Sequence, residues 1–394
     1  MDRGNIYEEV ERVLKEVCVN IGERPTGSKK NRQLEDYARL YFVGNGFDVE
    51  TQQFECINWE NRGANLYIAG KELDVKPSYY TTACSLEAEY ITLGSDAELE
   101  RSNLKNRIAV LYDELTAEQL MPKGFAFYNP IEHQKTISFL EEKEPSAIIT
   151  VVHDNTSIFE DGDFDIPSAY VTEEEGDVLL KGKGKISLEI NTSRRDAGGA
   201  NLIARINPDK NKKLVVTAHI DTKHGTPGAL DNGTGVVILL LLSSIIKPED
   251  IDFSLELLLL NGEDYYSTPG QLKYLEEYII GDKKTFLAIN CDGIGLKDSK
   301  TAVSFLELSK SRKVLLEKLI SKREGVDLIE PWEMGDHMLF VMNGIPAVTI
   351  TSKEIFKSFD EIVHTERDSI DIIDRDKIIK VINFIAEFIT NVEK

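Results

Sequence analysis

The second half of the chain contains apolar runs that lead directly into residues with metal-binding side chains. The first run, residues 214–218, leads into His219 and Asp221, and Asp231 follows ten residues later. In an open α/β sheet, ligands bind just outside the carboxyl ends of the strands. Apolar strands that end in a histidine and carboxylates therefore predict a polar crevice at one edge of a mostly parallel sheet.

The same plan recurs in three further runs: residues 255–260 lead into Glu263 and Asp264, residues 286–289 lead into Asp292, and residues 345–350 are followed by His364. Taken alone, each of these side chains has an ordinary explanation as a buried histidine, a solvated turn or a helix-capping turn. Their repetition at four successive strand ends favours a single site instead. The pattern predicts a metal-dependent hydrolase.

The spacing of these residues suggests a role for each. His219 and Asp221 are two residues apart in an extended segment, so their side chains project to the same side. The Asp221 carboxylate can then reach the second ring nitrogen of His219 and fix its tautomer. Asp231 lies in a Gly-rich turn at the start of the next helix, where a carboxylate can bridge two cations. Glu263 and Asp264 are neighbours where the chain changes direction, so one can ligate a metal while the other faces a bound water.

Charge counting favours two zinc ions per chain. Two zinc ions bring four positive charges, while Asp231, Asp264, Asp292 and a bridging hydroxide bring four negative ones. The metal centre then carries no buried excess charge. Zinc lowers the pKa of a bound water to about 7. Glu263 could pass the proton of that water to a leaving amine.

Composition narrows the class of protein. The chain has 394 residues and a formal net charge of −22, which argues against binding to nucleic acid. Its richest apolar run, residues 236–246, falls short of the ~20 residues that span a membrane. The first residues form an amphipathic pattern without the apolar core of a signal peptide. The four cysteines lie far apart without a C-x-x-C pair. We expect a cytoplasmic protein with buried free thiols and no membrane or nucleic-acid partner.

The spacing of apolar residues, and with it the predicted secondary structure, changes twice along the chain. Helical apolar spacing covers residues 7–19 and 33–43, and short strand-like pieces separated by charged turns follow from Arg62 to Arg195. Beyond Asp196, long apolar strands alternate with helices, which implies parallel strands and crossover helices. We expect one α/β domain, formed by residues 1–61 and 196–394, with a mostly parallel twisted sheet and helices on both faces. A smaller, β-rich domain is expected to be inserted at residues 62–195.

Six motifs resemble those of the co-catalytic dizinc aminopeptidase family, which includes bacterial leucyl aminopeptidases, glutamate carboxypeptidase and the transferrin receptor. The motifs are Ala218-His-Ile-Asp221, the run from Pro227 to Gly235, Gly262-Glu-Asp264, the run from Asn290 to Gly295, Gly335-Asp-His337 before Gly344-Ile-Pro346, and His364-Thr-Glu-Arg-Asp368. The resemblance covers residues 196–394 and the first 60, where Gly22-Glu-Arg-Pro-Thr-Gly-Ser28 resembles the family's N-terminal loop. The inserted region resembles a protease-associated domain, most clearly from Ile166 to Gly176.

The resemblance implies a zinc exopeptidase that acts on peptides, with aminopeptidase as the favoured direction. By resemblance, His219 and Asp292 would hold one zinc ion, Asp264 and His364 the other, Asp231 would bridge them, and Glu263 would be the general base. A metal-bound hydroxide would attack the first peptide carbonyl, and cobalt or manganese could substitute for zinc. The alternatives are a carboxypeptidase or dipeptidase of the same fold, and a non-catalytic binding protein like the transferrin receptor.

Two positions depart from the family pattern. Asp264 stands where the family most often has a glutamate, so its zinc must lie closer to the backbone or bind less tightly. Val363 stands where several members have a tyrosine that stabilises the oxyanion. Tyr265 and Tyr266 are candidates for that role, as are the metals alone. The sequence leaves open the preferred side chain, the native metal and the oligomeric state.

Three other histidines are expected to lie outside the site. His133 and His153 belong to the inserted region and are predicted to be surface residues. His224 lies close in sequence to His219 and Asp221 and is predicted to be a loop residue rather than a ligand.

Overall fold

The computed structural model describes residues 3–153, 156–357 and 359–393. The chain divides into two compact units, which we call the split unit (Met1–Cys56 and Ala197–Lys394) and the inserted unit (Ile57–Asp196). β1 (Asp48–Ile68) and β8 (Lys185–Ile206) pair with each other and contribute residues to both units. Within the described ranges, no helix combines the length and the apolar character needed to cross a membrane.

The split unit is built on a mixed, mostly parallel sheet in the order β13–β12–β14–β11–β9–β10–β8. The pairs β13·β12, β14·β11, β11·β9 and β9·β10 are parallel, whereas β12·β14 and β10·β8 are antiparallel. Its strands are β9 (Lys213–His219), β10 (Ser254–Leu260), β11 (Thr285–Cys291), β12 (Thr301–Leu306), β13 (Val326–Leu328) and β14 (Ala347–Ser352). Four of these strands coincide with the predicted apolar runs.

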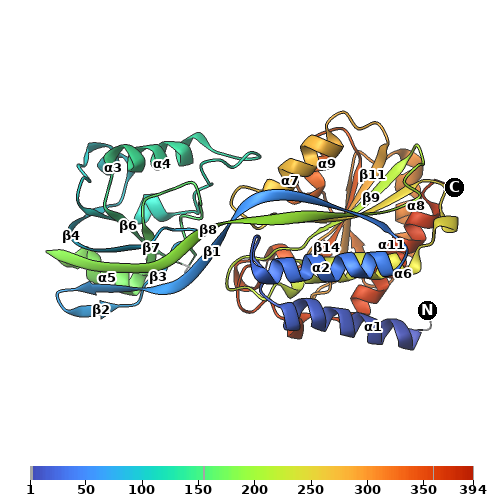
Figure 1. Cartoon of the computed structure of the whole chain (residues 1–394), viewed down its shortest axis with the longest axis horizontal. Helices are drawn as coiled ribbons and strands as arrows, with labels where there is room; N and C mark the ends of the chain where they lie inside the picture. The colour runs from blue at the N-terminus through green and yellow to red at the C-terminus, as the bar shows by residue number, and fades with distance from the viewer. Residues whose placement is uncertain (1–2, 154–155, 358, 394) are drawn as a thin grey trace. The chain divides into compact units, whose positions relative to one another are not determined.

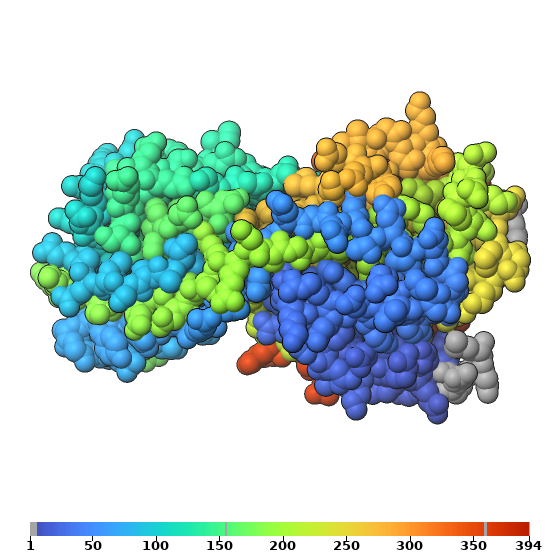
Figure 2. All heavy atoms as spheres, viewed as in Figure 1, coloured from blue at the N-terminus to red at the C-terminus, as the bar shows by residue number. Residues whose placement is uncertain are grey.

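Helices lie on both faces of this sheet, as predicted (Figure 1). One side carries α1 (Arg3–Lys15), α2 (Lys29–Gly44), α6 (Thr234–Ile245), α8 (Lys310–Ser321) and α11 (Arg375–Asn391). The other side carries α7 (Pro269–Tyr274) and α9 (His337–Val341). The short helices are η1 (Glu16–Ile21), η3 (Ala229–Gly233), η4 (Pro248–Asp250), η5 (Leu275–Ile279), η6 (Ile355–Lys357), α10 (Phe359–Ile362) and η7 (Ile370–Ile372). Figure 2 shows α1 and α2, in blue, at the surface of this unit.

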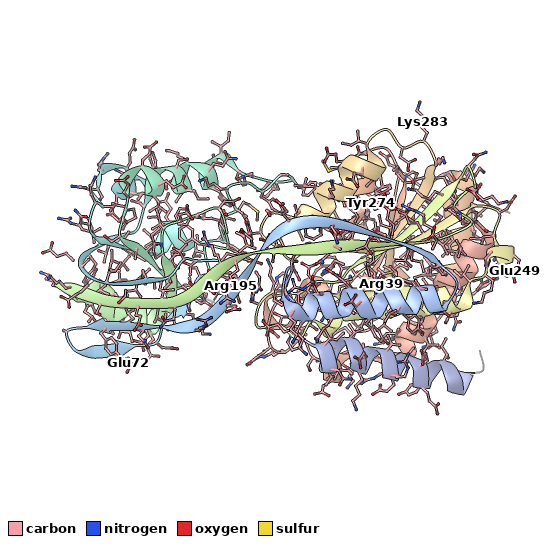
Figure 3. The ribbon with its side chains drawn as sticks, in the orientation of Figure 1. Arg39, Glu72, Arg195, Glu249, Tyr274 and Lys283 are labelled. Carbon is pink, nitrogen blue, oxygen red and sulfur yellow. The ribbon has the colours of Figure 1, made fainter. Side chains whose placement is uncertain are left out.

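The two faces of the sheet differ in chemistry. Alternate residues of β9 and β11, such as Val216 and Ile289, join the large apolar cluster beneath α1, α6 and α11. Every residue of α6 from Thr234 to Ser243 is buried, so this helix is apolar all round because it lies inside the unit. On the opposite face, Tyr274 of α7 donates its hydroxyl to buried Glu256 of β10. Figure 3 labels Tyr274 there and shows Lys283 pointing away from the unit.

The inserted unit has its own sheet, in which β4 to β7 pair in parallel in chain order and β3 is antiparallel to β7. Two apolar clusters stabilise it. Its elements are β2 (Lys71–Leu73), β3 (Lys76–Pro77), β4 (Cys84–Leu93), α3 (Asp96–Arg101), β5 (Ile108–Leu111), η2 (Asp113–Thr116), α4 (Ile131–Lys143), β6 (Ala147–Val152), β7 (Ser168–Thr172) and α5 (Glu173–Lys181).

The prediction of a surface position is wrong for one of the two histidines in the inserted unit. His133 is buried on α4, where its Nδ1 accepts the backbone N–H of Met121 at 3.0 Å and its Nε2 lies 3.1 Å from Glu118. His153 is exposed, as predicted. The expectation of buried thiols holds for Cys18 and Cys291, while Cys56 and Cys84 are only half-buried; all four are free.

Candidate metal centre

Two histidines from distant parts of the chain face one aspartate. His219 ends β9 and is buried, and its Nε2 lies 2.9 Å from Oδ1 of Asp231. The other carboxylate oxygen of Asp231, Oδ2, lies 3.1 Å from Nε2 of His364. Asp231 therefore stands between the two imidazoles, with one oxygen towards each.

Asp231 occupies an irregular turn rather than the start of a regular helix. Its φ of −116° and ψ of 91° are not helical, and α6 begins only at Thr234. Gly235 lets this turn pass close to the end of β11. A Cβ at Gly235 would lie 2.3 Å from Oδ1 of Asn232 and 2.5 Å from the carbonyl oxygen of Cys291. The tight turn presents the Asp231 carboxylate at the strand ends.

Asp264 and Asp292 complete two groups around Asp231. Oδ1 of Asp264 lies 2.9 Å from Nε2 of His364, and Oδ1 of Asp292 lies 3.7 Å from Nε2 of His219. Ligand atoms within 4.8 Å of one another are offered by His219, Asp231 and Asp292, and also by Asp231, Asp264 and His364. The structure thus brings together all five residues that the family resemblance assigns to metals. Two of the three described groups share Asp231, and the third consists of His219, Glu263 and Asp264.

Asp221 holds the turn that carries Glu263 and Asp264. Its Oδ1 accepts the backbone N–H groups of Gly262 and Glu263 at 2.8 and 3.2 Å, and its Oδ2 accepts that of Asp264 at 3.0 Å. Asp221 also lies 3.6 Å from Nδ1 of His219, which is within ion-pair range but beyond hydrogen-bond length. Its main contacts are therefore with the turn, rather than with the imidazole that the residue spacing suggested.

The donor set fits divalent cations. Imidazole nitrogens and carboxylate oxygens are the protein ligands that zinc takes, together with thiolates. Oδ2 of Asp264 is buried and has no hydrogen-bond partner in the described part of the chain. A buried carboxylate oxygen without a partner is unfavourable, and a cation beside it would satisfy it.

Burial and neighbouring charged groups shift the pKa values in this centre. Burial, reinforced by Asp264, Asp336 and Asp292, raises the pKa of Glu263 well above its ordinary value. Burial also raises the pKa of Asp264. Burial alone would lower the pKa of His364, but the neighbouring carboxylates outweigh it and raise this pKa to about 10. Burial and neighbouring carboxylates thus both act on these groups, and bound cations would neutralise the negative charge of the carboxylates.

Asp368 holds the backbone of the Asp231 turn, and sequence reasoning assigned it no role. Its carboxylate oxygens accept the backbone N–H groups of Leu230 at 2.5 Å and of Asp231 at 3.0 Å. Asp368 is fully buried, and burial raises its pKa to about 7. The sequence feature that could have pointed to Asp368 is its place in the His364-Thr-Glu-Arg-Asp368 motif.

Arg24 closes the loop between β9 and the Asp231 turn. Its fully buried guanidinium donates to the carbonyl oxygens of Ile220 at 2.7 Å, Pro227 at 3.0 Å and Gly228 at 2.8 Å. These acceptors lie at both ends of the loop, so the hydrogen bonds of Arg24 hold the two ends of the loop close to each other. In the sequence, Arg24 stands within the loop from Gly22 to Ser28 that resembles the family's N-terminal loop. That resemblance assigned no role to the arginine.

A cavity of about 210 Å³ opens beside the centre, and Asp231, Glu263, Asp292 and His364 form part of its lining. Much of the remaining wall is apolar or aromatic: Trp332, Met334, Ile355, Phe356 and Val363. The rings of Trp332 and Phe356 meet edge-on, with centroids 5.4 Å apart. The cavity therefore combines a carboxylate-rich end with an apolar wall.

Neither candidate tyrosine lines this cavity. Tyr265 and Tyr266 are buried and pack against each other, with ring centroids 4.5 Å apart, and neither is among the described lining residues. Val363, at the position where several members of the resembled family have tyrosine, is itself part of the wall. The polar side chains that line the cavity apart from the charged groups include those of Asn290 and Thr351.

Two further histidines belong to the split unit. Nδ1 of His224 lies 3.9 Å from Oε1 of Glu23, and His224 belongs to none of the described ligand groups. His337 is buried at the start of α9, and its Nε2 lies 2.9 Å from the carbonyl oxygen of Trp332. Sequence reasoning had placed His337 within a motif without a role.

Comparisons with known proteins point to one family and one fold. The model of peptidase family M28 matches residues 201–389. No curated protein matches the chain. Solved structures of similar fold include BSAP, a zinc aminopeptidase from Bacillus subtilis, with 18% identity, a TM-score of 0.78 and coverage of 98% of this chain and 95% of that chain.

Two other solved structures show how widely this fold is used. An aminopeptidase from Aneurinibacillus sp. strain AM-1 matches with 19% identity, a TM-score of 0.73 and coverage of 98% of this chain and 93% of that chain. A glutaminyl cyclase from Porphyromonas gingivalis matches with 16% identity, a TM-score of 0.52 and coverage of 99% and 97%. At these identities the similarity confirms the predicted fold, while the reaction has to be argued from the site.

Proposed function

Residues 201–389 belong to peptidase family M28, as the sequence motifs predicted, and from this membership we propose that the chain is an aminopeptidase with two zinc ions. The position of Asp231 carries the proposal, because its two carboxylate oxygens lie 2.9 Å from His219 and 3.1 Å from His364. A carboxylate between two imidazoles suits a pair of cations that share it. His219 and Asp292 would hold one ion, and Asp264 and His364 the other.

Zinc ions bound there would lower the pKa of a shared water to about 7 and polarise the peptide carbonyl. Glu263 is placed to move the proton, since it lines the cavity and its Oε2 lies 4.0 Å from Nε2 of His219. It would take a proton from the attacking water and deliver it to the leaving amine. Asp221 would keep Glu263 in position by accepting its backbone N–H.

The charge of the cavity favours an aminopeptidase over a carboxypeptidase. A carboxypeptidase needs a cationic side chain for the terminal carboxylate of its substrate. No lysine or arginine is among the described residues that line the cavity, and its carboxylates, those of Asp231, Glu263 and Asp292, would be engaged with the metals and the attacking water. The absence of a cationic side chain from this described lining supports an aminopeptidase.

The wall of the cavity supports a preference for apolar side chains. Trp332, Met334, Ile355 and Phe356 present apolar or aromatic surface that an uncharged N-terminal side chain can cover. A charged side chain would lose its hydration there without gaining a partner. We therefore propose leucine-like or phenylalanine-like N-terminal residues as the preferred substrates.

A substrate panel tests the direction of cleavage. The purified chain, supplied with zinc, cobalt or manganese, would be given peptides with free ends, the same peptides with an acetylated N-terminus, and the same peptides with an amidated C-terminus. An aminopeptidase loses activity on N-terminal acetylation and keeps it on C-terminal amidation. The reverse pattern would replace the proposal with a carboxypeptidase.

Two other outcomes of the same panel are informative. A peptide with an N-terminal glutamine would report cyclisation instead of hydrolysis, as expected of a glutaminyl cyclase of this fold. An absence of turnover with all metals and all peptides would favour the non-catalytic alternative. The complete set of candidate ligands argues against that alternative.

The nature of the inserted region is a separate proposal. We propose that residues 62–195 form a protease-associated-like module inserted into the peptidase domain of residues 1–61 and 196–394. Expressing residues 57–196 alone would test this, because an independent module should give a cooperative thermal unfolding transition.

We also propose a cytoplasmic location, which the four free cysteines support. Fractionation of the source cells would test it.

A further inference from the structure

Four polar side chains form a row across one face of the sheet in the split unit. Thr217 of β9 pairs with Asn290 of β11, Asn290 pairs with Thr349 of β14, and Thr349 pairs with Ser304 of β12. Residues paired directly across neighbouring strands point to the same face. Since Val216 belongs to the apolar cluster, the row lies on the opposite face, the one that carries α7 and α9.

Every member of this row has a buried polar atom without a partner in the described part of the chain. These atoms are Oγ1 of Thr217, Oδ1 of Asn290, Oγ1 of Thr349 and Oγ of Ser304. None of the four residues is more than 3% exposed. Most buried polar groups in proteins have a partner, so four neighbouring exceptions point to a ligand that joins them.

The helices above the row add three more such groups. Nδ1 of His337, Oδ2 of Asp336 and Oε1 of Gln271 are buried and without a described partner, although Nε2 of Gln271 donates to Oδ1 of Asp336 at 3.2 Å. A Cβ at Gly335 would lie 3.5 Å from Nδ1 of His337 and 3.7 Å from Nδ2 of Asn290. His337 and Asn290 therefore lie close to the same point beside Gly335.

We propose that this polar layer, between the sheet and helices α7 and α9, binds a chain of ordered water molecules that reaches the cavity at Asn290. Hydroxyl groups donate and accept, and Oδ1 of Asn290 and Oδ2 of Asp336 accept, so water satisfies all of them. A buried water usually makes two to four hydrogen bonds to groups that otherwise have no partner.

The layer is continuous with the candidate metal centre. Asn290 lines the cavity and belongs to the row, and it lies two residues before Asp292. The layer gives the cavity an internal source of water at Asn290. This inference rests on the buried polar atoms alone and holds whether or not the chain is an aminopeptidase.

A pair of near-isosteric variants separates a hydrated layer from a dry one. In a hydrated layer, Thr349→Val removes a partner from bound water, so the melting temperature should fall by about 2–4 °C. In a dry layer, the same change removes an unsatisfied hydroxyl, and the melting temperature should rise. Ser304→Ala tests the other end of the row with the same two outcomes.

The matched control is Val348→Thr, because Val348 is adjacent in sequence but belongs to the apolar cluster on the other face. It measures the loss caused by a hydroxyl group in a dry environment. A crystal structure at high resolution should show water within hydrogen-bond distance of Thr217, Thr349 and Ser304. Absence of that water, direct bonding among these side chains, or a rise in melting temperature in both row variants would each overturn the proposal.

Discussion

The carboxylate of Asp368 accepts the backbone N–H of Asp231 at 3.0 Å, and this contact orients the residue that stands between the two histidines. Asp368 follows His364 by four residues, so one short segment supplies a candidate ligand and also holds the carboxylate that lies between the two histidines. The contact is made in a fully buried place, where water does not compete for the N–H. Asp368 is therefore a positioning residue for the candidate metal centre.

Replacing Asp368 by alanine should weaken metal binding. Without the acceptor, the N–H groups of Leu230 and Asp231 lose their partner, and the Asp231 carboxylate loses its fixed direction. Residues that orient metal ligands typically contribute 10–100-fold to metal affinity or activity. We expect a loss of about that size in the affinity for zinc, measured by titration of the apo-protein, with activity partly restored at high zinc concentration.

Glu366→Ala is the control for Asp368→Ala. Glu366 lies in the same segment and is exposed, so its replacement removes a carboxyl group from the segment without touching the turn. Equal zinc affinity in the two variants would show that Asp368 does not position Asp231.

Much of the site could be predicted because its residues follow apolar strands. Parallel strands bring their carboxyl ends to one edge, so His219, Asp264 and Asp292 had to converge once β9, β10 and β11 were recognised as neighbours. The pairing into two groups came from the resemblance to a family, because sequence spacing does not set the distances from Asp231 to His219 and His364.

What the sequence did not predict depends on tertiary contacts. Arg24 and Asp368 are buried charged residues whose partners are backbone groups more than a hundred positions away, and no periodic pattern reveals such partners. The same holds for Asp221, whose spacing pointed to His219 while the folded turn offers it three N–H groups. Strand β12 (Thr301–Leu306) was missed because its polar residues interrupt the apolar pattern.

Glu263→Gln should remove catalysis while leaving the metals bound. The amide keeps the size of the side chain but cannot take the proton of the attacking water, and general acid–base groups typically contribute 10²–10⁴-fold. We expect kcat to fall by at least ~100-fold, with the zinc content, measured by elemental analysis, unchanged. A variant with near-normal turnover would show that another group moves the proton.

Asp264→Ala should remove one of two ions. Asp264 contacts His364 at 2.9 Å, and as an aspartate it reaches less far than the glutamate most common in the family, so its ion should be the weaker one. Calorimetric titration of the wild-type apo-protein should show one tight and one looser site, and only the tight site in Asp264→Ala. Two equal sites in the wild type, or two ions retained by the variant, would remove Asp264 from the ligand set.

Glu35 should make the stability of the split unit depend on pH. It accepts the backbone N–H of Ala200 at 3.0 Å and the side-chain amide of Asn261 at 2.9 Å. Burial raises its pKa from an ordinary value near 4.5 to about 7. A carboxyl group with a raised pKa binds its proton more readily in the folded state than in the unfolded chain. Its contribution to stability is therefore complete below about pH 4.5 and is lost as the pH rises through about 7.

Glu35→Gln should abolish that loss, because glutamine keeps an accepting oxygen but has no charge to bury. We expect the melting temperature of the variant to equal that of the wild type at pH 4 and to exceed it at pH 8, measured by differential scanning calorimetry. Asp36→Asn, at the exposed neighbouring position, removes one negative charge at pH 8 and corrects for the change of net charge there. A difference between Glu35→Gln and the wild type that is the same at both pH values would mean that Glu35 is not protonated on folding, and that its contacts with Ala200 and Asn261 alone account for its effect.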